Sequence, residues 1–154
     1  MTIKIVWGIF YAILFIANTA VAQPDSLWSR TFGGSSSDYC YSVQQTTDGG
    51  YILGGYTQSF GESWGDFWLV KTDENGDSLW SRTFGRSYAD RCYSVQQTTD
   101  GGYVLGGRTH LHGIDDVDFW LVKTDANGDS LWSRTFGGNN SDAVSYTHLT
   151  LPTN

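Results

Sequence analysis

Beyond residue 25 the chain contains runs with the two-residue period of β-strands, whose successive side chains face opposite sides of a sheet. In the stretch 79–84, the odd positions carry Leu, Ser and Thr, and the even positions carry Trp, Arg and Phe. After residue 25 no stretch shows the 3.6-residue period of an amphipathic helix. The pattern therefore predicts short strands, and four of them cover residues 40–46, 51–57, 67–72 and 79–84.

Short glycine-containing segments separate these strands. Asp48-Gly49-Gly50 lies between the first and second strands, and Glu74-Asn75-Gly76 lies between the third and fourth. Glycine adopts positive φ without steric cost, and Asn-Gly is a strong hairpin signal. The four strands are therefore expected to form an antiparallel sheet, and the fold class is predicted to be all-β.

The four predicted strands belong to a sequence unit that repeats. When the chain is shifted by 52 residues, residues 25–76 fall on residues 77–128, and 38 of the 52 positions are identical. A third copy begins at Asp129 and reaches Asp142. A period of this length is typical of arrays in which each repeat is one supersecondary unit. Complete units are expected over 40–91 and 92–142, and residues 23–39 are expected to hold the outer strand of an incomplete unit.

Three motifs mark the repeat, and in the first copy they read W-S-R-T-F-G-G, T-D-G-G-Y-I-L-G-G-Y-T and D-F-W-L-V-K-T-D-E-N-G-D. With these motifs the chain resembles a family of secreted bacterial β-propeller repeat proteins. The resemblance implies an incomplete β-propeller with two four-stranded antiparallel blades plus flanking strands. Propellers have at least four blades, so the resemblance also implies that missing parts of the protein close the ring, with residues 27–32 as one half of the seal.

The first 22 residues differ from the rest. Lys4 precedes an apolar run that starts at Ile5, and Ala20-Val21-Ala22 stands before Gln23. This order is typical of a secretory signal peptide, so residues 1–22 are predicted to be cleaved and the mature protein to be secreted or held at the cell surface. The alternative is an uncleaved anchor, because residues 5–22 could nearly span a bilayer.

The repeat stops after Asp142. Residues 144–153, V-S-Y-T-H-L-T-L-P-T, equal the translation of an adapter that is used in transposase-based sequencing libraries. Residues 143–154 are therefore predicted not to be biological, and the chain is expected to be the first part of a longer protein. The alternative is a natural, divergent C-terminal tail.

Charge and cysteine content narrow the possible partners. The formal net charge of −7 argues against nucleic acid as the main partner. Cys40 and Cys92 occupy equivalent positions of the two units. Such positions in neighbouring blades are usually more than about 7 Å apart at Cα, so two small buried residues are favoured over a disulfide.

Five tryptophans recur at fixed positions of the repeat inside predicted strands. They are Trp28, Trp80 and Trp132 at one position, and Trp68 and Trp120 at another. Large aromatic side chains that recur in this way are expected to pack between units. Trp64 differs, because it lies in a predicted loop and its counterpart in the second copy is an aspartate.

The differences between the two copies are concentrated. Of 14 differing positions, 11 lie in residues 34–39 and 58–65 and their counterparts, which are the connections at one end of the predicted sheets. Either this end binds a ligand, or its longer loops drift freely. The candidate ligand-binding residues are Trp64, Tyr88, His110, His112 and Asp115, and the wider set adds Ser36, Tyr39, Phe60 and Arg91.

Two patterns could hold a metal ion. His110 and His112 would lie on one side of a strand, although a solvated loop explains them as well. Around Asn75, and again around Asn127, acidic and amide residues alternate as in some calcium loops. The glycine of that loop is misplaced for calcium, so a simple hairpin turn is the favoured interpretation.

No catalytic motif is present, and no metal or cofactor is predicted. The sequence therefore favours a non-enzymatic binding or structural module with an unknown extracellular protein or carbohydrate ligand, without a membrane span once the signal is cleaved. One alternative is the N-terminal part of a secreted enzyme whose active site lies in missing blades or domains. Another is a purely structural spacer.

Overall fold

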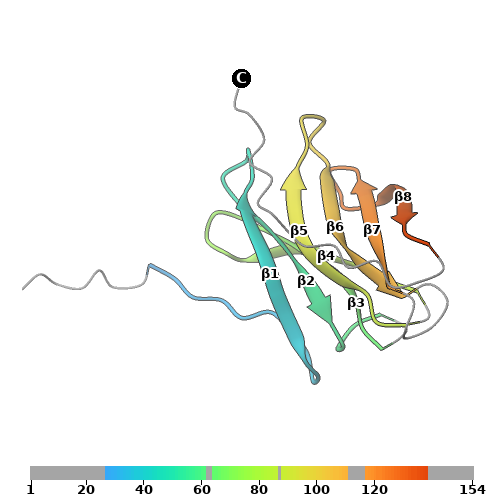
Figure 1. The fold of residues 1–154 in the computed structure, drawn as a ribbon. Coiled ribbons are helices and arrows are strands. Elements are labelled where there is room, and N and C mark those ends of the chain that lie inside the picture. Colours follow the sequence, from blue (N-terminus) through green and yellow to red (C-terminus); the bar gives the residue numbers. More distant parts are fainter. Residues whose placement is uncertain (1–26, 62–63, 87, 111–116, 139–154) are drawn as a thin grey trace, which may run out of the picture.

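The computed structural model describes residues 27–61, 64–86, 88–110 and 117–138. The predicted signal peptide, residues 1–22, and the predicted adapter-derived tail, residues 143–154, lie outside this part. The described residues form an all-β structure of two four-stranded antiparallel sheets, shown in Figure 1. The first sheet contains β1 (Asp38–Gln45), β2 (Tyr51–Thr57), β3 (Asp66–Thr72) and β4 (Ser78–Phe84), and the second contains β5 (Arg91–Gln97), β6 (Tyr103–His110), β7 (Val117–Thr124) and β8 (Ser130–Phe136).

Each sheet follows the order of its strands along the chain, so every strand pairs with its sequence neighbours. The four strands predicted for the first unit agree with β1–β4 within two residues at each end. Both predicted hairpin turns are present, because Gly49 and Gly76 have φ values of 87° and 77°. The φ of each glycine lies where other residues are strained, which explains why these turns need glycine.

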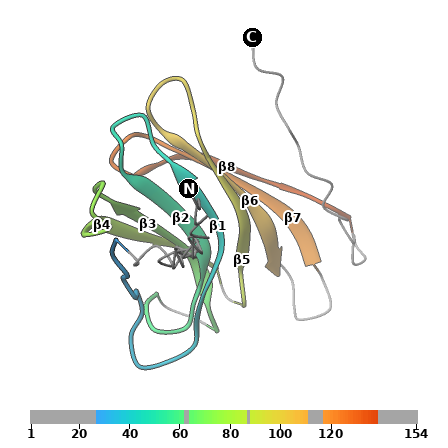
Figure 2. The same cartoon turned by 90° about the vertical axis from the view of Figure 1, so that its left-hand side faces the viewer.

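The two sheets pack face to face, and Figure 2 shows them side by side. The first sheet contributes Ile52, Phe67 and Leu69, which are fully buried. They share one face because Ile52 pairs opposite Lys71, and Phe67 and Leu69 alternate with outward residues along β3. The face that the second sheet presents to them consists of Cys92, Val95, Tyr103, Leu105, Trp120 and Val122.

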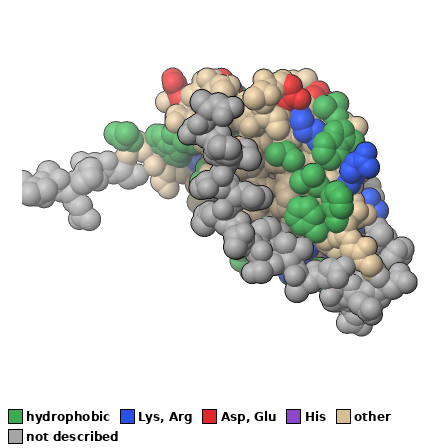
Figure 3. Space-filling view, turned by 45° about the horizontal axis from the view of Figure 1, so that its top comes forward, with side chains coloured by type: hydrophobic (Ala, Val, Ile, Leu, Met, Phe, Trp, Pro, Cys, Tyr) green, Lys and Arg blue, Asp and Glu red, His purple; other side chains and the backbone are tan. Residues whose placement is uncertain are grey.

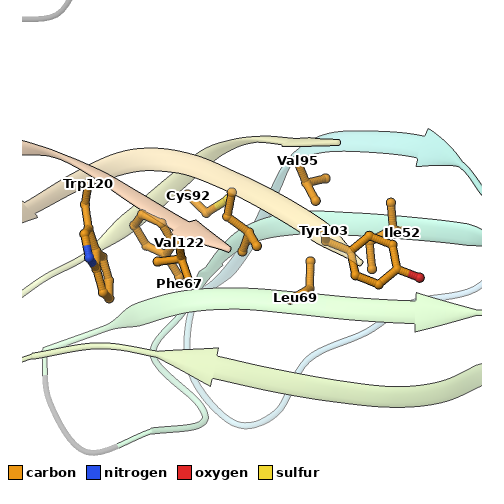
Figure 4. Packing of buried hydrophobic residues seen from close by; sticks show 9 residues of the cluster. Ile52, Phe67, Leu69, Cys92, Val95, Tyr103, Trp120 and Val122 are labelled. Carbon is orange, nitrogen blue, oxygen red and sulfur yellow. The ribbon is translucent and has the colours of Figure 1, made fainter. Parts of the chain in front are cut away.

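Figure 4 shows how these side chains interlock in the core. The rings of Phe67 and Trp120 lie closest, with centroids 4.6 Å apart and planes at 53°. Close approach at the centre of the core requires a glycine. A Cβ at Gly54 would lie only 3.0 Å from the Cβ of Val95, so any larger residue would push the sheets apart.

The same strand sequence is buried differently in the two sheets. All seven residues of β3 are buried, whereas buried and half-buried residues alternate along β7. The difference arises because the first sheet is covered on both faces, by the second sheet and by the N-terminal segment 27–32. Among the described residues, the outer face of the second sheet has no such cover.

The N-terminal segment, residues 27–32, contacts the first sheet in the same way as β4 contacts the second sheet. Trp28 packs edge-on against Tyr51 with centroids 5.7 Å apart, and Trp80 packs in the same way against Tyr103 at 5.8 Å. The Arg30 Nε donates to Asp77 over 2.8 Å. The pair 52 residues later, Arg82 with Asp129, repeats this bond at 3.0 Å. Residues 27–32 thus occupy the place of an outer strand from a preceding unit. They form no strand themselves, contrary to the expectation, because no described inner strand lies beside them to pair with.

The recurring tryptophans follow from this arrangement. Trp120 is buried in the core, and Trp80 packs against its edge, as expected for packing between units. Trp28 and Trp68 line a cavity of about 500 Å³ on the other face of the first sheet. Trp132 on β8 is exposed, because no described segment lies against it.

In each sheet a lysine of the third strand binds the turn between the first two strands, and we call this contact the lysine clasp. The Lys71 ammonium is almost wholly buried and donates to the Thr72 carbonyl at 2.7 Å and to the Asp48 carboxylate at 2.9 Å. Asp48 also accepts hydrogen bonds from the Thr46 hydroxyl and the Gly50 amide. The hydrogen bond from Thr46, followed by that from Lys71, lowers the pKa of Asp48 to about 2.

We expect the lysine clasp around Asp48 to make the free energy of unfolding fall at acid pH. Because the pKa of Asp48 in the folded chain lies below the ordinary 3.8, its contribution is complete above that value and is lost as the pH falls towards about 2. Asp48→Asn should remove this dependence. The carboxylate is largely in water, so the difference between wild type and variant should be only about 1 kcal/mol. Urea unfolding at pH 6, 4 and 2.5 measures it, and equal pH dependence in both proteins would contradict the clasp.

The difference in burial between the two sheets gives a second prediction. Phe67→Ala should lower the free energy of unfolding by about 3–5 kcal/mol, because it leaves a cavity in the core. Phe119→Ala removes the same side chain at the matching, half-buried position of β7 and should cost only about 1 kcal/mol. Urea denaturation in dilute solution compares the two variants. Equal losses would show that the sheets do not pack through the Phe67 face.

Candidate functional site

The candidate ligand-binding residues lie at the end of the sheets opposite the tight turns. The β2–β3 connection, residues 58–65, and the β4–β5 connection, residues 85–90, both emerge there. The Asp90 amide donates to the Gly65 carbonyl over 2.8 Å. The Ser36 amide donates to the Ser59 hydroxyl over 3.0 Å. Two connections and the segment before β1 therefore meet, and these are the segments in which the two copies differ.

Tyr56 anchors this end of the first sheet. Its ring is buried and lies under the Arg91 guanidinium, with 5.1 Å from Arg91 Cζ to the ring centroid. Its hydroxyl donates to the Trp64 carbonyl over 2.8 Å. Gly65 follows with φ 129°, and a Cβ there would overlap the Tyr56 ring. The backbone of Trp64 is thus fixed while its side chain remains 74% exposed.

Two further aromatic side chains are exposed at this end of the first sheet. Tyr39 packs at an angle against Tyr56, with centroids 6.1 Å apart. Phe60 packs against Trp68 at 5.5 Å. Tyr39 and Phe60 lie on opposite faces of the first sheet, because Tyr39 pairs beside Tyr56 on the core face, whereas Trp68 belongs to the outer face. Tyr39 and the exposed Trp64 are therefore the aromatic side chains that meet Arg91 around Tyr56. Tyrosine and tryptophan rings are amphipathic and can stack on a ligand while their polar atoms remain hydrated.

The Asp38 carboxylate joins the segment before β1 to the start of the β2–β3 connection. Asp38 accepts hydrogen bonds from the Thr57 and Ser59 hydroxyls and from the Gly34 amide. Burial alone would raise the pKa of Asp38, but these hydrogen bonds hold it below its usual value. At the matching position, burial is the dominant effect and raises the pKa of Asp90, which is fully buried.

The sequence did not single out the tyrosines of β1 and β5 that continue this surface. Tyr39 stacks on Tyr41 with centroids 6.1 Å apart and planes at 7°. Tyr41 in turn packs against Tyr93 at 5.3 Å, and Arg108 lies 6.0 Å over the Tyr93 ring. Tyr41 and Tyr93 occupy matching positions, so a comparison of the two copies could not reveal them. The repeated C-Y-S-V strand was the available signal.

The other predicted residues are more dispersed. Tyr88 is half-buried in the β4–β5 connection. His110 lies at the end of β6, opposite Val117, and is also half-buried. His112 and Asp115 lie outside the described residues. The structure therefore brings Tyr39, Trp64 and Arg91 of the wider set together around Tyr56. Phe60 lies on the other face of the first sheet, against Trp68, and His110 lies on the second sheet.

The alternating acidic turns serve the backbone. One Asp73 carboxylate oxygen accepts the amides of Asn75 and Asp77 over 2.9 and 2.8 Å, and Asp77 pairs with Arg30. The turn around Asn127 has the same bonds. In the described part of the chain no three potential ligands of His, Cys, Asp or Glu type group around one point. The hairpin-turn interpretation explains these residues.

The two cysteines are free thiols. Cys92 is fully buried in the core, as expected for a small apolar residue. Cys40 at the matching position is exposed, which differs from the expectation. The reason is that Cys92 is covered by Gly54 of the neighbouring sheet, whereas Cys40 lines the cavity on the outer face of the first sheet.

The Tyr56 anchor gives a testable prediction. Tyr56→Phe removes the hydroxyl that holds the Trp64 carbonyl but keeps the buried ring, so residues 64–66 should exchange their amide hydrogens faster while the core is unaffected. Hydrogen exchange read by mass spectrometry measures this. Tyr39→Phe, in a half-exposed tyrosine, is the matched control and should leave exchange unchanged. Unaltered exchange in Tyr56→Phe would mean that the bond does not hold the loop.

Comparison with known proteins adds no family to this picture. No protein-family model matches the chain, and no curated protein matches it significantly. The resemblance to β-propeller repeat proteins therefore stays an inference from the motifs. Across the described ranges, no helix is long and apolar enough to cross a membrane.

Proposed function

We propose that the chain is part of an exported, non-enzymatic β-propeller repeat protein in which each four-stranded sheet is one blade. The observation that carries the proposal is the position of residues 27–32, which bind the first sheet with the contacts that β4 makes to the second. A segment that occupies the place of an outer strand, without inner strands of its own, suits a ring that is sealed by both chain ends. Export is inferred from residues 1–22 and places the protein outside the cell or on its surface.

Within this protein, we propose that the loop end binds a saccharide. Tyr39 and Trp64 offer exposed aromatic faces, and such faces stack on the apolar C–H surfaces of sugar rings. The adjacent Arg91 guanidinium provides several hydrogen-bond donors that suit sugar hydroxyl groups. The net charge of −7 makes a polyanion such as nucleic acid an unfavourable ligand.

The test is affinity electrophoresis of the purified protein in gels that contain neutral or acidic polysaccharides. We expect at least one polysaccharide to retard the wild type, and Trp64→Ala to abolish the retardation. Trp132→Ala is the matched control, because Trp132 is also exposed but lies on β8, away from the connections. Retardation that persists in Trp64→Ala, or no retardation in any gel, would overturn the saccharide proposal and favour a protein ligand.

A further inference from the structure

Each sheet of the stacked pair has an outer face. Residues 27–32 cover part of the outer face of the first sheet, and no described segment covers the outer face of the second sheet. The outer face of the first sheet carries Val43, Leu53, Trp68 and Val70 around the 500 Å³ cavity. The outer face of the second sheet carries Val104, Phe119 and Leu121, all half-buried. Figure 3 shows hydrophobic side chains gathered on the side where Figure 1 shows β6, β7 and β8.

These two faces are the counterparts of the two faces that already form the core. A shift of 52 residues turns the outer face of the first sheet into Val95, Leu105, Trp120 and Val122, which the core buries. The same shift turns Ile52, Phe67 and Leu69 into the outer face of the second sheet. The outer face of the first sheet therefore corresponds to the core face of the second sheet, and the outer face of the second corresponds to the core face of the first. The two outer faces can thus pack against each other as the two core faces do. We propose that a second copy of this chain stacks its second sheet on the first sheet, head to tail, through a repeat of the core interface, and so fills the place that a further blade takes in the proposed propeller.

The polar contacts of the existing interface can be repeated as well. Val95 N donates to the Ser42 hydroxyl at 3.2 Å, and Gln97 N donates to the Gln44 side chain at 2.7 Å. Between copies, the donors would be Val43 and Gln45 of one chain, and the acceptors Ser94 and Gln96 of the other. All four residues are the same types as in the observed contacts.

The contact between Arg91 and Tyr56 involves two positions at which the copies differ, but the two differences compensate for each other. In the existing interface Arg91 lies over the Tyr56 ring. The counterpart of Arg91 is Tyr39, and the counterpart of Tyr56 is Arg108. Stacking of two chains would therefore place Tyr39 of one against Arg108 of the other. The first sheet of one chain would then supply the ring, and the second sheet of the other chain would supply the cation, so a cation–π contact is retained.

The incoming sheet competes with the N-terminal segment. β8 has the sequence S-L-W-S-R-T-F, identical to that of β4 and of residues 26–32. In the stacked pair, Trp132 would take the place of Trp28 beside Tyr51, and Arg134 would take the place of Arg30 at Asp77. Because β8 forms the same kinds of interaction as the segment that it replaces, the displacement costs little. The saccharide proposal shares Tyr39 with this stacking, but Trp64, which its test replaces, takes no part in the stacking contacts.

An interface of this kind is heterologous, so it extends into chains or closes into a ring. This gives a complementation test. Val43→Asp blocks the outer face of the first sheet, and Val43 is 63% exposed, so the variant should fold. Gly106→Asp blocks the outer face of the second sheet, and a Cβ at Gly106 would meet only the Phe119 ring at 3.7 Å. Circular dichroism and urea unfolding verify that both variants are folded.

Sedimentation velocity then measures association. The wild type should form species larger than a dimer as its concentration rises, whereas each variant alone should remain monomeric. An equimolar mixture of the two variants should form one dimer and nothing larger, because only one pair of intact faces is left. Trp64→Ala should associate like the wild type. A monomeric wild type, self-association of either variant, or a mixture that stays monomeric would each overturn the proposal.

Two further measurements examine the geometry. Arg30→Ala should strengthen association and Arg134→Ala should weaken it, each by about two- to fivefold in the dissociation constant, as for an exposed ion pair. Association should also protect Cys40 from alkylation, because a second copy's Gly106 would cover it as Gly54 covers Cys92. Cys92 is the internal control that stays protected throughout. Equal effects of the two arginine variants, or unchanged Cys40 reactivity in the associated protein, would contradict stacking through these faces.

Discussion

The packing of the Phe67 face of the first sheet against the Trp120 face of the second determines the rest of the structure. A sheet with an apolar face has to bury that face against another element to form a stable domain. Stacking removes Ile52, Phe67 and Leu69 from water on one side and Leu105, Trp120 and Val122 on the other. Burial of one such side chain stabilises the fold by roughly 1.5–3 kcal/mol. This contact also fixes which face of each strand points outwards.

Neighbouring structure, rather than local sequence, sets the properties of individual residues. Phe67 and Phe119 occupy the same position of the repeat, yet only Phe67 is fully buried. Cys92 is inaccessible, and Cys40 is exposed. Asp38 and Asp90 even have pKa values shifted in opposite directions, because hydrogen bonds prevail in one and burial in the other. Each difference follows from what covers the sheet at that place.

The two ends of the sheets have different structural roles. At one end, the lysine clasps and the Asp73-type turns use residues that are the same in both copies, and their polar groups bind the backbone or one another. At the other end, connections of variable sequence meet around Tyr56 and leave aromatic side chains in solvent. The constant end holds the strands in register, which leaves the connections at the variable end free to differ between the copies.

Period-two alternation and glycine turns determined the all-β class, the strand limits and the order of strands within each sheet, because these features depend on contacts between near neighbours in sequence. The variable connections also identified Tyr39, Trp64 and Arg91, which the structure brings together. The sequence could not reveal the tyrosine row of β1 and β5, since Tyr41 and Tyr93 do not differ between copies. Only the tertiary structure decided which of two matching faces is buried, because identical residues become core or surface according to the sheet that lies against them.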